Sequence, residues 1–193
     1  FTCDQNGRSI SGTDITAALL VLQGMGIDAF GLNCSAGPDQ MLPQLRRLRE
    51  YARIPLIAKP NAGMPEIVNG EAVYNCPPEE FVALVPEMLK AGVALFGGCC
   101  GTDPEYVAAL RHMVDAFRAK DAMGEAGRFL MGAKDVDGLK VLTATLNDAG
   151  ADQLRKMGDF LKDKDANVVA VLSSVTDGKI TCLLYTSDAA DEE

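Results

Sequence analysis

The sequence predicts an α/β fold. About four strand–helix units form part of a (β/α)8 (TIM) barrel, and a small truncated α+β unit follows them. Two observations support this prediction. Short apolar runs alternate with helical patterns along residues 1–117, which is typical of parallel strands joined by right-handed crossovers. The character changes near residue 118, where a β-α-β-β pattern begins. A complete barrel needs about 250 residues, so residues 1–117 supply about half of one.

The elements of the two units are expected in a regular order. After a strand end within residues 1–10, the pattern predicts helices at 13–25, 39–52, 77–89 and 103–117, with strands at 27–32, 54–58 and 93–96. The second unit is expected to hold strands at 138–146 and 167–175, a helix at 152–164, a turn at Asp177-Gly178 and a strand from Ile180. We therefore predict domains at 1–117 and 118–181, with a tail at 182–193.

Composition narrows the function classes. The 193 residues are 48% hydrophobic, enough for a substantial core, and carry a net charge of −9, which disfavours nonspecific nucleic-acid binding by the whole chain. No apolar run is long enough to span a membrane. The chain opens at Phe1 without a signal peptide, so we expect a piece of a longer protein. Six cysteines without extracellular signals favour a reducing, cytoplasmic location.

Two adjacent cysteines, Cys99 and Cys100, lie among glycines directly after the predicted strand 93–96. Adjacent cysteines do not easily form an ordinary disulfide with each other, because their spacing is too short. They can ligate one metal ion if a third ligand arrives, and the candidate is Cys34, in a Gly/Pro-rich turn after the strand at 27–32. Three thiolates with one open position are the pattern of a catalytic zinc. Small buried hydrophobes or a redox pair are the alternatives.

The helix after the cysteine pair is expected to begin with a capping box. Thr102 precedes Glu105 by three residues, and Pro104 falls in the first turn, where its missing N–H costs nothing.

Several motifs together resemble the C-terminal half of the homocysteine S-methyltransferase barrel, of the type found in cobalamin-dependent methionine synthase. The matching segments of residues 1–117 are Gly31-Leu32-Asn33-Cys34 with Gly37-Pro38, Lys59-Pro60-Asn61-Ala62-Gly63, Tyr74 with Pro77, Glu80 and Phe81, and Gly97-Gly98-Cys99-Cys100-Gly101-Thr102. The resemblance implies that Cys34, Cys99 and Cys100 bind Zn²⁺ and that the thiol of homocysteine takes the fourth position. The first half of such a barrel, which supplies much of the homocysteine pocket, is missing from the sequence.

The implied chemistry is transfer of a methyl group to the homocysteine sulfur, giving methionine. A free thiol is mostly protonated at neutral pH, and zinc coordination deprotonates it. Three thiolate ligands keep the metal a weak Lewis acid, so the substrate sulfur stays nucleophilic. The methyl donor, methylcobalamin, a methylfolate or a sulfonium compound, would be presented by another module. We expect this chain to be inactive, because half a barrel leaves open strand edges and an exposed apolar interior, so that it aggregates or seeks a partner.

Residues 118–181 resemble the C-terminal region of alanyl-tRNA synthetase. The match runs through residues 134–141, 151–155, 168–172 and 177–179. It implies the alternative function, a tRNA-binding or dimerisation module, and is the only reason to expect a nucleic-acid partner. Residues 182–193 resemble one reading frame of a sequencing adapter, so we expect the chain to be a misassembled fragment and set the tail aside.

Other residues carry weaker hypotheses. Cys3 and Cys76 are expected to be packing residues, Cys182 to belong to the tail, and His112 to lie on a helix surface. Asn33 and Asn61 either shape the site near the metal or form turns. The arginines of the helix at 39–52 are expected on a solvated face, with its leucines inward.

Overall fold

The computed structural model describes residues 1–147, 149–176 and 178–186. The chain forms two compact units, Phe1–Asp115 and the residues from Ala116 onward, and each is described separately. No helix among the described residues has the length and hydropathy that crossing a bilayer requires.

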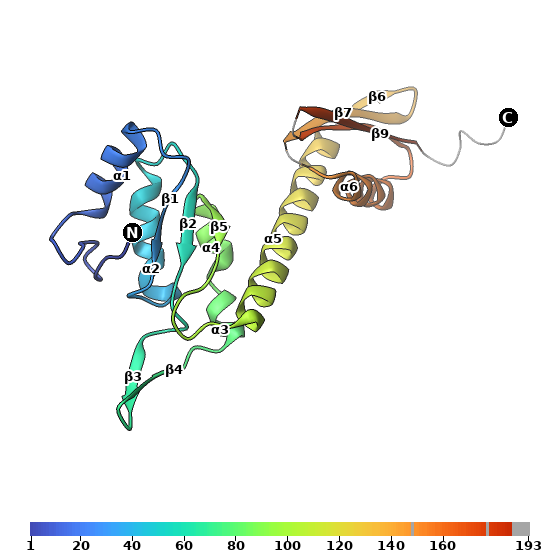
Figure 1. Ribbon diagram of the computed structural model, residues 1–193. Helices are drawn as coiled ribbons and strands as arrows, with labels where there is room; N and C mark the ends of the chain where they lie inside the picture. The colour runs from blue at the N-terminus through green and yellow to red at the C-terminus, as the bar shows by residue number, and fades with distance from the viewer. Residues whose placement is uncertain (148, 177, 187–193) are drawn as a thin grey trace. The chain divides into compact units, whose positions relative to one another are not determined.

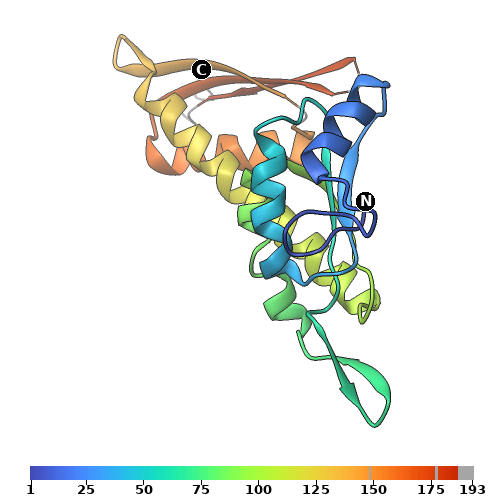
Figure 2. The same cartoon turned by 90° about the vertical axis from the view of Figure 1, so that its left-hand side faces the viewer.

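The first unit is built on a parallel sheet, which confirms the α/β class. Its three strands follow the order β1-β2-β5, and both pairs are parallel. The strands are β1 (Phe30–Asn33), β2 (Leu56–Lys59) and β5 (Val93–Phe96), and the helices between them are α1 (Ile15–Gly24), α2 (Pro38–Arg49), α3 (Pro78–Val82) and α4 (Val85–Lys90). Figures 1 and 2 show helices α1, α2 and α4 beside this sheet.

One face of the sheet makes the core of this unit. Phe30 and Leu32 on β1 and Leu56 and Ala58 on β2 are buried, because alternate residues of a strand point to the same face. Helix α2 covers this face with its predicted leucine stripe, of which Leu45 is fully buried. Burial of each large apolar side chain contributes about 1.5–3 kcal/mol.

A fourth strand position is marked by Phe1. Its amino group donates to Gly31 O at 2.8 Å, and its carbonyl accepts from Asn33 N at 3.1 Å. Bonds to the residues before and after Leu32 are the pattern of a parallel ladder. The strand end predicted within residues 1–10 therefore lies beside β1, on the edge opposite β2.

A β-hairpin that was not predicted from the sequence lies between β2 and α3. Strands β3 (Pro65–Val68) and β4 (Glu71–Tyr74) pair antiparallel and project away from the parallel sheet in Figures 1 and 2. The turn between them is Asn69-Gly70, and both residues have positive φ, 53° and 86°. Asn-Gly between apolar runs is the usual signal of such a two-residue turn. The sequence therefore contains the signal from which this hairpin can be predicted.

Helix α5 (Pro104–Met131) corrects two expectations. Asp103, not Thr102, caps it: Asp103 Oδ1 accepts from Glu105 N at 2.8 Å, so the predicted capping box is wrong. The helix also continues past the predicted end at residue 117. Alanine, lysine, glutamate and arginine are strong helix formers, and they outweigh Gly124 and Gly127 within the last turns.

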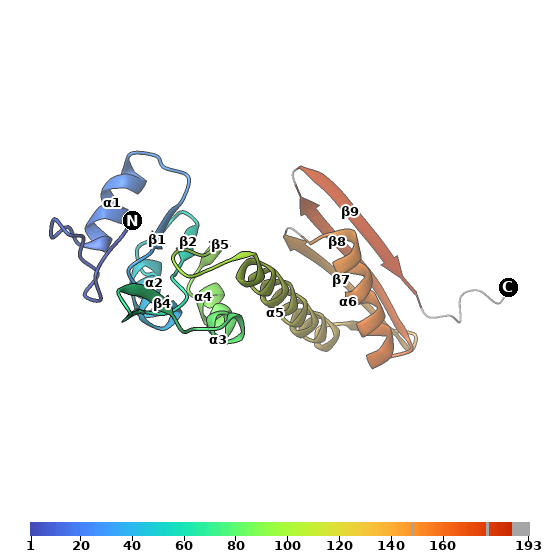
Figure 3. The same cartoon turned by 60° about the horizontal axis from the view of Figure 1, so that its bottom comes forward.

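The second unit is a mixed sheet in the order β6-β7-β8-β9, in which only β7 and β8 are parallel. Its elements are β6 (Lys134–Val136), β7 (Leu139–Asn147), α6 (Ala151–Lys164), β8 (Val168–Thr176) and β9 (Lys179–Tyr185). The predicted β-α-β-β pattern is present, and the sequence analysis missed β6. Figure 3 shows α6 lying along one face of this sheet.

Strand β9 runs into the segment that the sequence analysis set aside. Cys182 pairs with Ser173 and Tyr185 pairs with Ala170 of β8. The ring of Tyr185 packs against Gly158, where a Cβ would overlap it, and its hydroxyl donates to Asp159. Residues 182–185 therefore belong to the sheet, and residues 187–193 of the predicted tail lie outside the described residues.

Candidate metal centre

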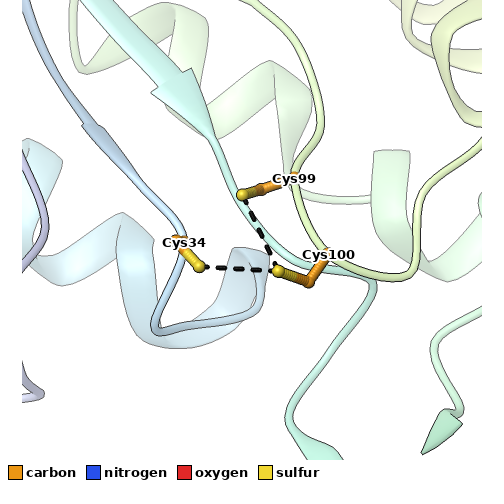
Figure 4. A group of neighbouring side chains, drawn as sticks. All are labelled: Cys34, Cys99 and Cys100. Carbon is orange, nitrogen blue, oxygen red and sulfur yellow. Dashed lines mark hydrogen bonds between the residues drawn. The ribbon is translucent and has the colours of Figure 1, made fainter. Parts of the chain in front are cut away.

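Three cysteine side chains meet at the carboxyl edge of the parallel sheet. Cys34 directly follows β1, whereas Cys99 and Cys100 follow β5. The Sγ atoms of Cys34 and Cys100 are 3.6 Å apart, and those of Cys99 and Cys100 are 4.0 Å apart (Figure 4). All three sulfurs lie within 4.8 Å of one another. The fold thus brings together thiols that are 65 residues apart in the chain, as the sequence analysis expected.

The spacing of the sulfurs fits a metal ion. Zinc–sulfur bonds of about 2.3 Å in a tetrahedron place the sulfurs about 3.8 Å apart. The observed distances of 3.6 and 4.0 Å bracket that value. A disulfide would need about 2.05 Å, and all three thiols are free. The cluster could therefore hold a metal ion without rearrangement of the backbone.

The end of the central strand β2 and the loop that follows it, residues 59–61, hold both cysteine segments in place. Lys59 O accepts the N–H of Cys34 at 3.1 Å, and Pro60 O accepts the N–H of Cys99 at 2.9 Å. Asn61 Oδ1 accepts the N–H of Cys100 at 3.2 Å. Because β2 lies between β1 and β5, its loop reaches the thiol-bearing loops on either side. Each of the three cysteine N–H groups is thus bound by one residue of the segment 59–61.

Asn61 is the side chain that links the two cysteine loops. It is 3% exposed. Its backbone N–H donates to Ala36 O at 2.9 Å, next to the Cys34 turn, while its side chain holds Cys100. Asn33 behaves differently, since its Oδ1 contacts Thr2 Oγ1 at 3.4 Å. Of the two asparagines considered from the sequence, Asn61 shapes the site.

The Cys34 turn has an unusual backbone. Cys34 and Ser35 both have φ of 61°, in the left-handed region that residues with a Cβ rarely adopt. Such a conformation costs about 1–2 kcal/mol per residue, and the surrounding hydrogen bonds hold it. The turn directs the Cys34 sulfur toward Cys100 (Figure 4).

Tyr74, at the end of β4, closes the Cys100 side of the site. Its ring lies where a Cβ on Gly101 would be, and Gly101 has φ of 78°. Both the space and the backbone conformation at this position therefore favour glycine. Interaction of its hydroxyl with the Cys100 side chain, followed by desolvation and the charges of the three nearby cysteines, raises the pKa of Tyr74. Thr102 fixes the other end of the loop by donating to Cys99 O at 2.7 Å.

The cluster is open on one side. Cys34 and Cys99 are half-buried and Cys100 is exposed, so a fourth ligand can reach the sulfurs. Within the described residues, this is the only group of histidine, cysteine and carboxylate side chains arranged to hold a metal. Cys3, Cys76 and Cys182 are free and lie outside it, and His112 is exposed on α5, as expected. Burial raises the pKa of Cys76, and Glu80 and Asp39 add to this effect.

The parallel sheet and its thiol cluster define an α/β domain that carries a candidate metal centre at its carboxyl edge. Residues 1–114 match the family Homocysteine S-methyltransferase, and the chain belongs to that family. The predicted enzyme class, homocysteine S-methyltransferase, is therefore confirmed at the level of the family.

The curated relatives of this chain include two methionine synthases. Those of Mycobacterium leprae and Mycobacterium tuberculosis are each 40% identical to this chain over 107 residues, or 55% of it. The chain spans only 9% of the length of either relative.

Solved relatives include the homocysteine methyltransferase MmuM from Escherichia coli. Its metallated form is 27% identical, with a TM-score of 0.42, over 52% of this chain and 30% of that one. The apo form is 25% identical, with a TM-score of 0.46, over 58% and 36%.

Proposed function

We propose that Cys34, Cys99 and Cys100 bind Zn²⁺, and that the thiolate of homocysteine completes the site and accepts a methyl group, giving methionine. The spacing of the sulfurs, 3.6 and 4.0 Å, is the observation that carries this proposal. Membership of the homocysteine S-methyltransferase family supports the substrate and the reaction.

The residues of the chain have separable roles in this proposal. When bound, the zinc ion supplies the positive charge that keeps a substrate thiol deprotonated at neutral pH. Residues 59–61 bind the backbone of the three cysteines and so keep their thiols within ligating distance of one another. The exposed side at Cys100 leaves room for the substrate sulfur and for an approaching donor. The attacking electron pair is that of the sulfur, and the methyl group moves onto it as the donor departs.

We further propose that another module presents the methyl donor, either methylcobalamin or a methylfolate. The short share of the methionine synthases that this chain covers supports this division. The chain alone is then expected to bind zinc without catalysing methyl transfer. An open sheet surface, on which Leu95 is 52% exposed, is consistent with a domain that needs further protein to complete it.

A cysteine exchange tests the metal site. Replacing Cys99 with alanine removes one of three thiolates and should abolish stoichiometric zinc binding by the full chain, measured by metal analysis after dialysis. Cys182→Ala, an exposed cysteine of the second unit, is the matched control and should bind as the wild type does. Homocysteine should bind the zinc-loaded wild type and not the Cys99→Ala variant. One equivalent of tightly bound zinc in Cys99→Ala would refute the proposal.

The alternative for residues 118–181, a tRNA-binding or dimerisation module, stays a prediction from the sequence. That segment contains ten basic and ten acidic residues, so it lacks the net positive charge that phosphate binding favours. The absence of tRNA binding at low salt would remove the nucleic-acid part of this alternative. A monomer in solution would remove the dimerisation part.

A further inference from the structure

Lys59 lies against both cysteine loops. It ends strand β2, in register with Asn33, and its carbonyl accepts the N–H of Cys34 at 3.1 Å. Its side chain crosses toward β5, because a Cβ built on Gly97 would lie 3.3 Å from both Cγ and Cε of Lys59. Gly97 precedes Cys99 by two residues. Lys59 therefore contacts the Cys34 loop through its carbonyl and the Cys99 loop through its side-chain stem.

Within the described part of the chain, the charge of Lys59 has no acidic partner. No carboxylate of the described residues lies within 4.0 Å of its ammonium group. The other lysine of the first unit, Lys90, pairs with Glu87 at 2.8 Å, and Arg46 and Arg47 of α2 also have acidic partners. An unpaired cation on a residue that contacts both cysteine loops is chemically informative, because three thiolates around Zn²⁺ carry a net charge of −1, and a fourth makes it −2.

We propose that Lys59 is the counter-charge of the metal–thiolate group, strengthening zinc binding and favouring entry of the substrate as a thiolate. This inference rests on the proposed zinc site. The ammonium acts through space on a negatively charged group and need not touch the metal. Gly97 leaves room for this stem, since a Cβ there would lie 3.3 Å from it and would push it by a few tenths of an ångström.

The alternative, that Lys59 only packs on Gly97, makes a different prediction. Methionine has a similar unbranched, apolar stem, so Lys59→Met keeps the packing and removes the charge. Arginine keeps the charge, so Lys59→Arg should restore what methionine loses. Lys90→Met makes the same change in net charge on α4 and is the matched control.

The experiment measures the dissociation constant of Zn²⁺ for the full chain by competition with a chromophoric chelator, at low and at high ionic strength. At low salt Lys59→Met should bind zinc about three- to tenfold more weakly, as expected for a partly solvated charge near the metal group. The difference should shrink at high salt because counter-ions screen it. Lys59→Arg and Lys90→Met should stay within about twofold of the wild type.

The outcomes separate the two proposals. Equal zinc affinity of wild type and Lys59→Met would overturn the role of Lys59 while leaving the zinc site intact. A loss in Lys59→Met that salt does not change, or that arginine does not rescue, would show a packing role and also overturn it. Failure of the wild type to bind zinc would remove the proposed function and this inference with it. Lys59→Gln serves as a second neutral variant if the methionine variant is insoluble.

Discussion

Each unit of the chain contains one buried polar side chain among the described residues, Asn61 in the first and Ser174 in the second. Both accept a hydrogen bond from a backbone N–H in a loop that follows a strand. Asn61 holds the N–H of Cys100, at 3.2 Å. Ser174 Oγ holds the N–H of Ala149, at 2.9 Å, in the loop between β7 and α6. The same interaction therefore organises a thiol site in one unit and a plain connection in the other.

The difference teaches where the chemistry of this chain resides. Both units contain parallel strands joined by a helix, and both bury an apolar face under helices. Only the first has cysteines in the loops at the carboxyl edge of its parallel strands. The scaffold supplies fixed strand ends, and the loop residues decide whether a site results.

The largest effect is expected from Asn61→Ala. This change leaves the Cys100 N–H without its acceptor and should lower the free energy of unfolding by about 1–3 kcal/mol. It should also weaken zinc binding, because Cys100 loses its anchor. Asn33→Ala is the control and should cost less than about 0.5 kcal/mol, since Asn33 makes only a long contact with Thr2. Chemical denaturation measures both, and similar losses would contradict the role given to Asn61.

Ser174→Ala tests the buried polar side chain of the second unit. Its hydroxyl is fully buried, so the change should cost about 1–2 kcal/mol by leaving the Ala149 N–H unpaired. Zinc affinity should not change, because no ligand lies in that unit. Denaturation and chelator competition on the same variant give the two values. A fall in zinc affinity would mean that the two buried polar residues do not serve separate purposes.

A stabilising change is expected at Ser35. Its φ of 61° suits glycine, so Ser35→Gly should relieve strain and raise the free energy of unfolding by up to about 1 kcal/mol. Ser173→Gly, in the extended strand β8, is the contrasting change and should destabilise. If Ser35→Gly destabilised the chain as much as Ser173→Gly does, the positive φ of Ser35 would carry no strain.

The smallest effects concern one acid–base pair in each unit. The hydrogen bond from Arg47 lowers the pKa of Asp14, and that from Lys140 lowers the pKa of Asp165. A lowered pKa in the folded state gives stability that is present above the unfolded pKa of about 3.9. That stability is lost as the pH falls through the folded pKa.

Each asparagine variant tests the pair in its own unit. Asp14→Asn and Asp165→Asn should therefore make the loss of stability below pH of about 4 less steep. Asparagine also serves as an N-cap of α1 in place of Asp14, so the helix start is kept. Thermal unfolding as a function of pH measures the slope, and an unchanged slope in both variants would contradict the assigned partners.

Much of the fold and the thiol cluster could be predicted from the sequence. Apolar runs before Cys34 and Cys99 fixed both residues at strand ends, and parallel strand ends share one edge of a sheet. These two facts are sufficient to predict that the sulfurs of Cys34, Cys99 and Cys100 lie close together. Hydrophobic periodicity likewise predicts the leucine face of α2 and the β-α-β-β order of the second unit.

The features that were missed depend on contacts between distant residues or on competing local signals. Asn61 reads as a turn residue, and only the placement of β2 between β1 and β5 shows that it holds Cys100. The cap at Asp103 overrides the Thr102 box because Thr102 bonds Cys99 O instead. Helix α5 passes Gly124 and Gly127 because the residues around them favour helix. Asn69-Gly70 between two apolar runs, by contrast, is a local signal from which the hairpin can be predicted.

X-ray absorption spectroscopy of the zinc-loaded chain tests the central claim most directly. We expect three sulfur neighbours at about 2.3 Å and one lighter atom. Addition of homocysteine should raise the count to four sulfurs, because its thiolate fills the open position. Fewer than three sulfurs in the first spectrum, or a count that homocysteine leaves unchanged, would contradict a metal centre built from Cys34, Cys99 and Cys100.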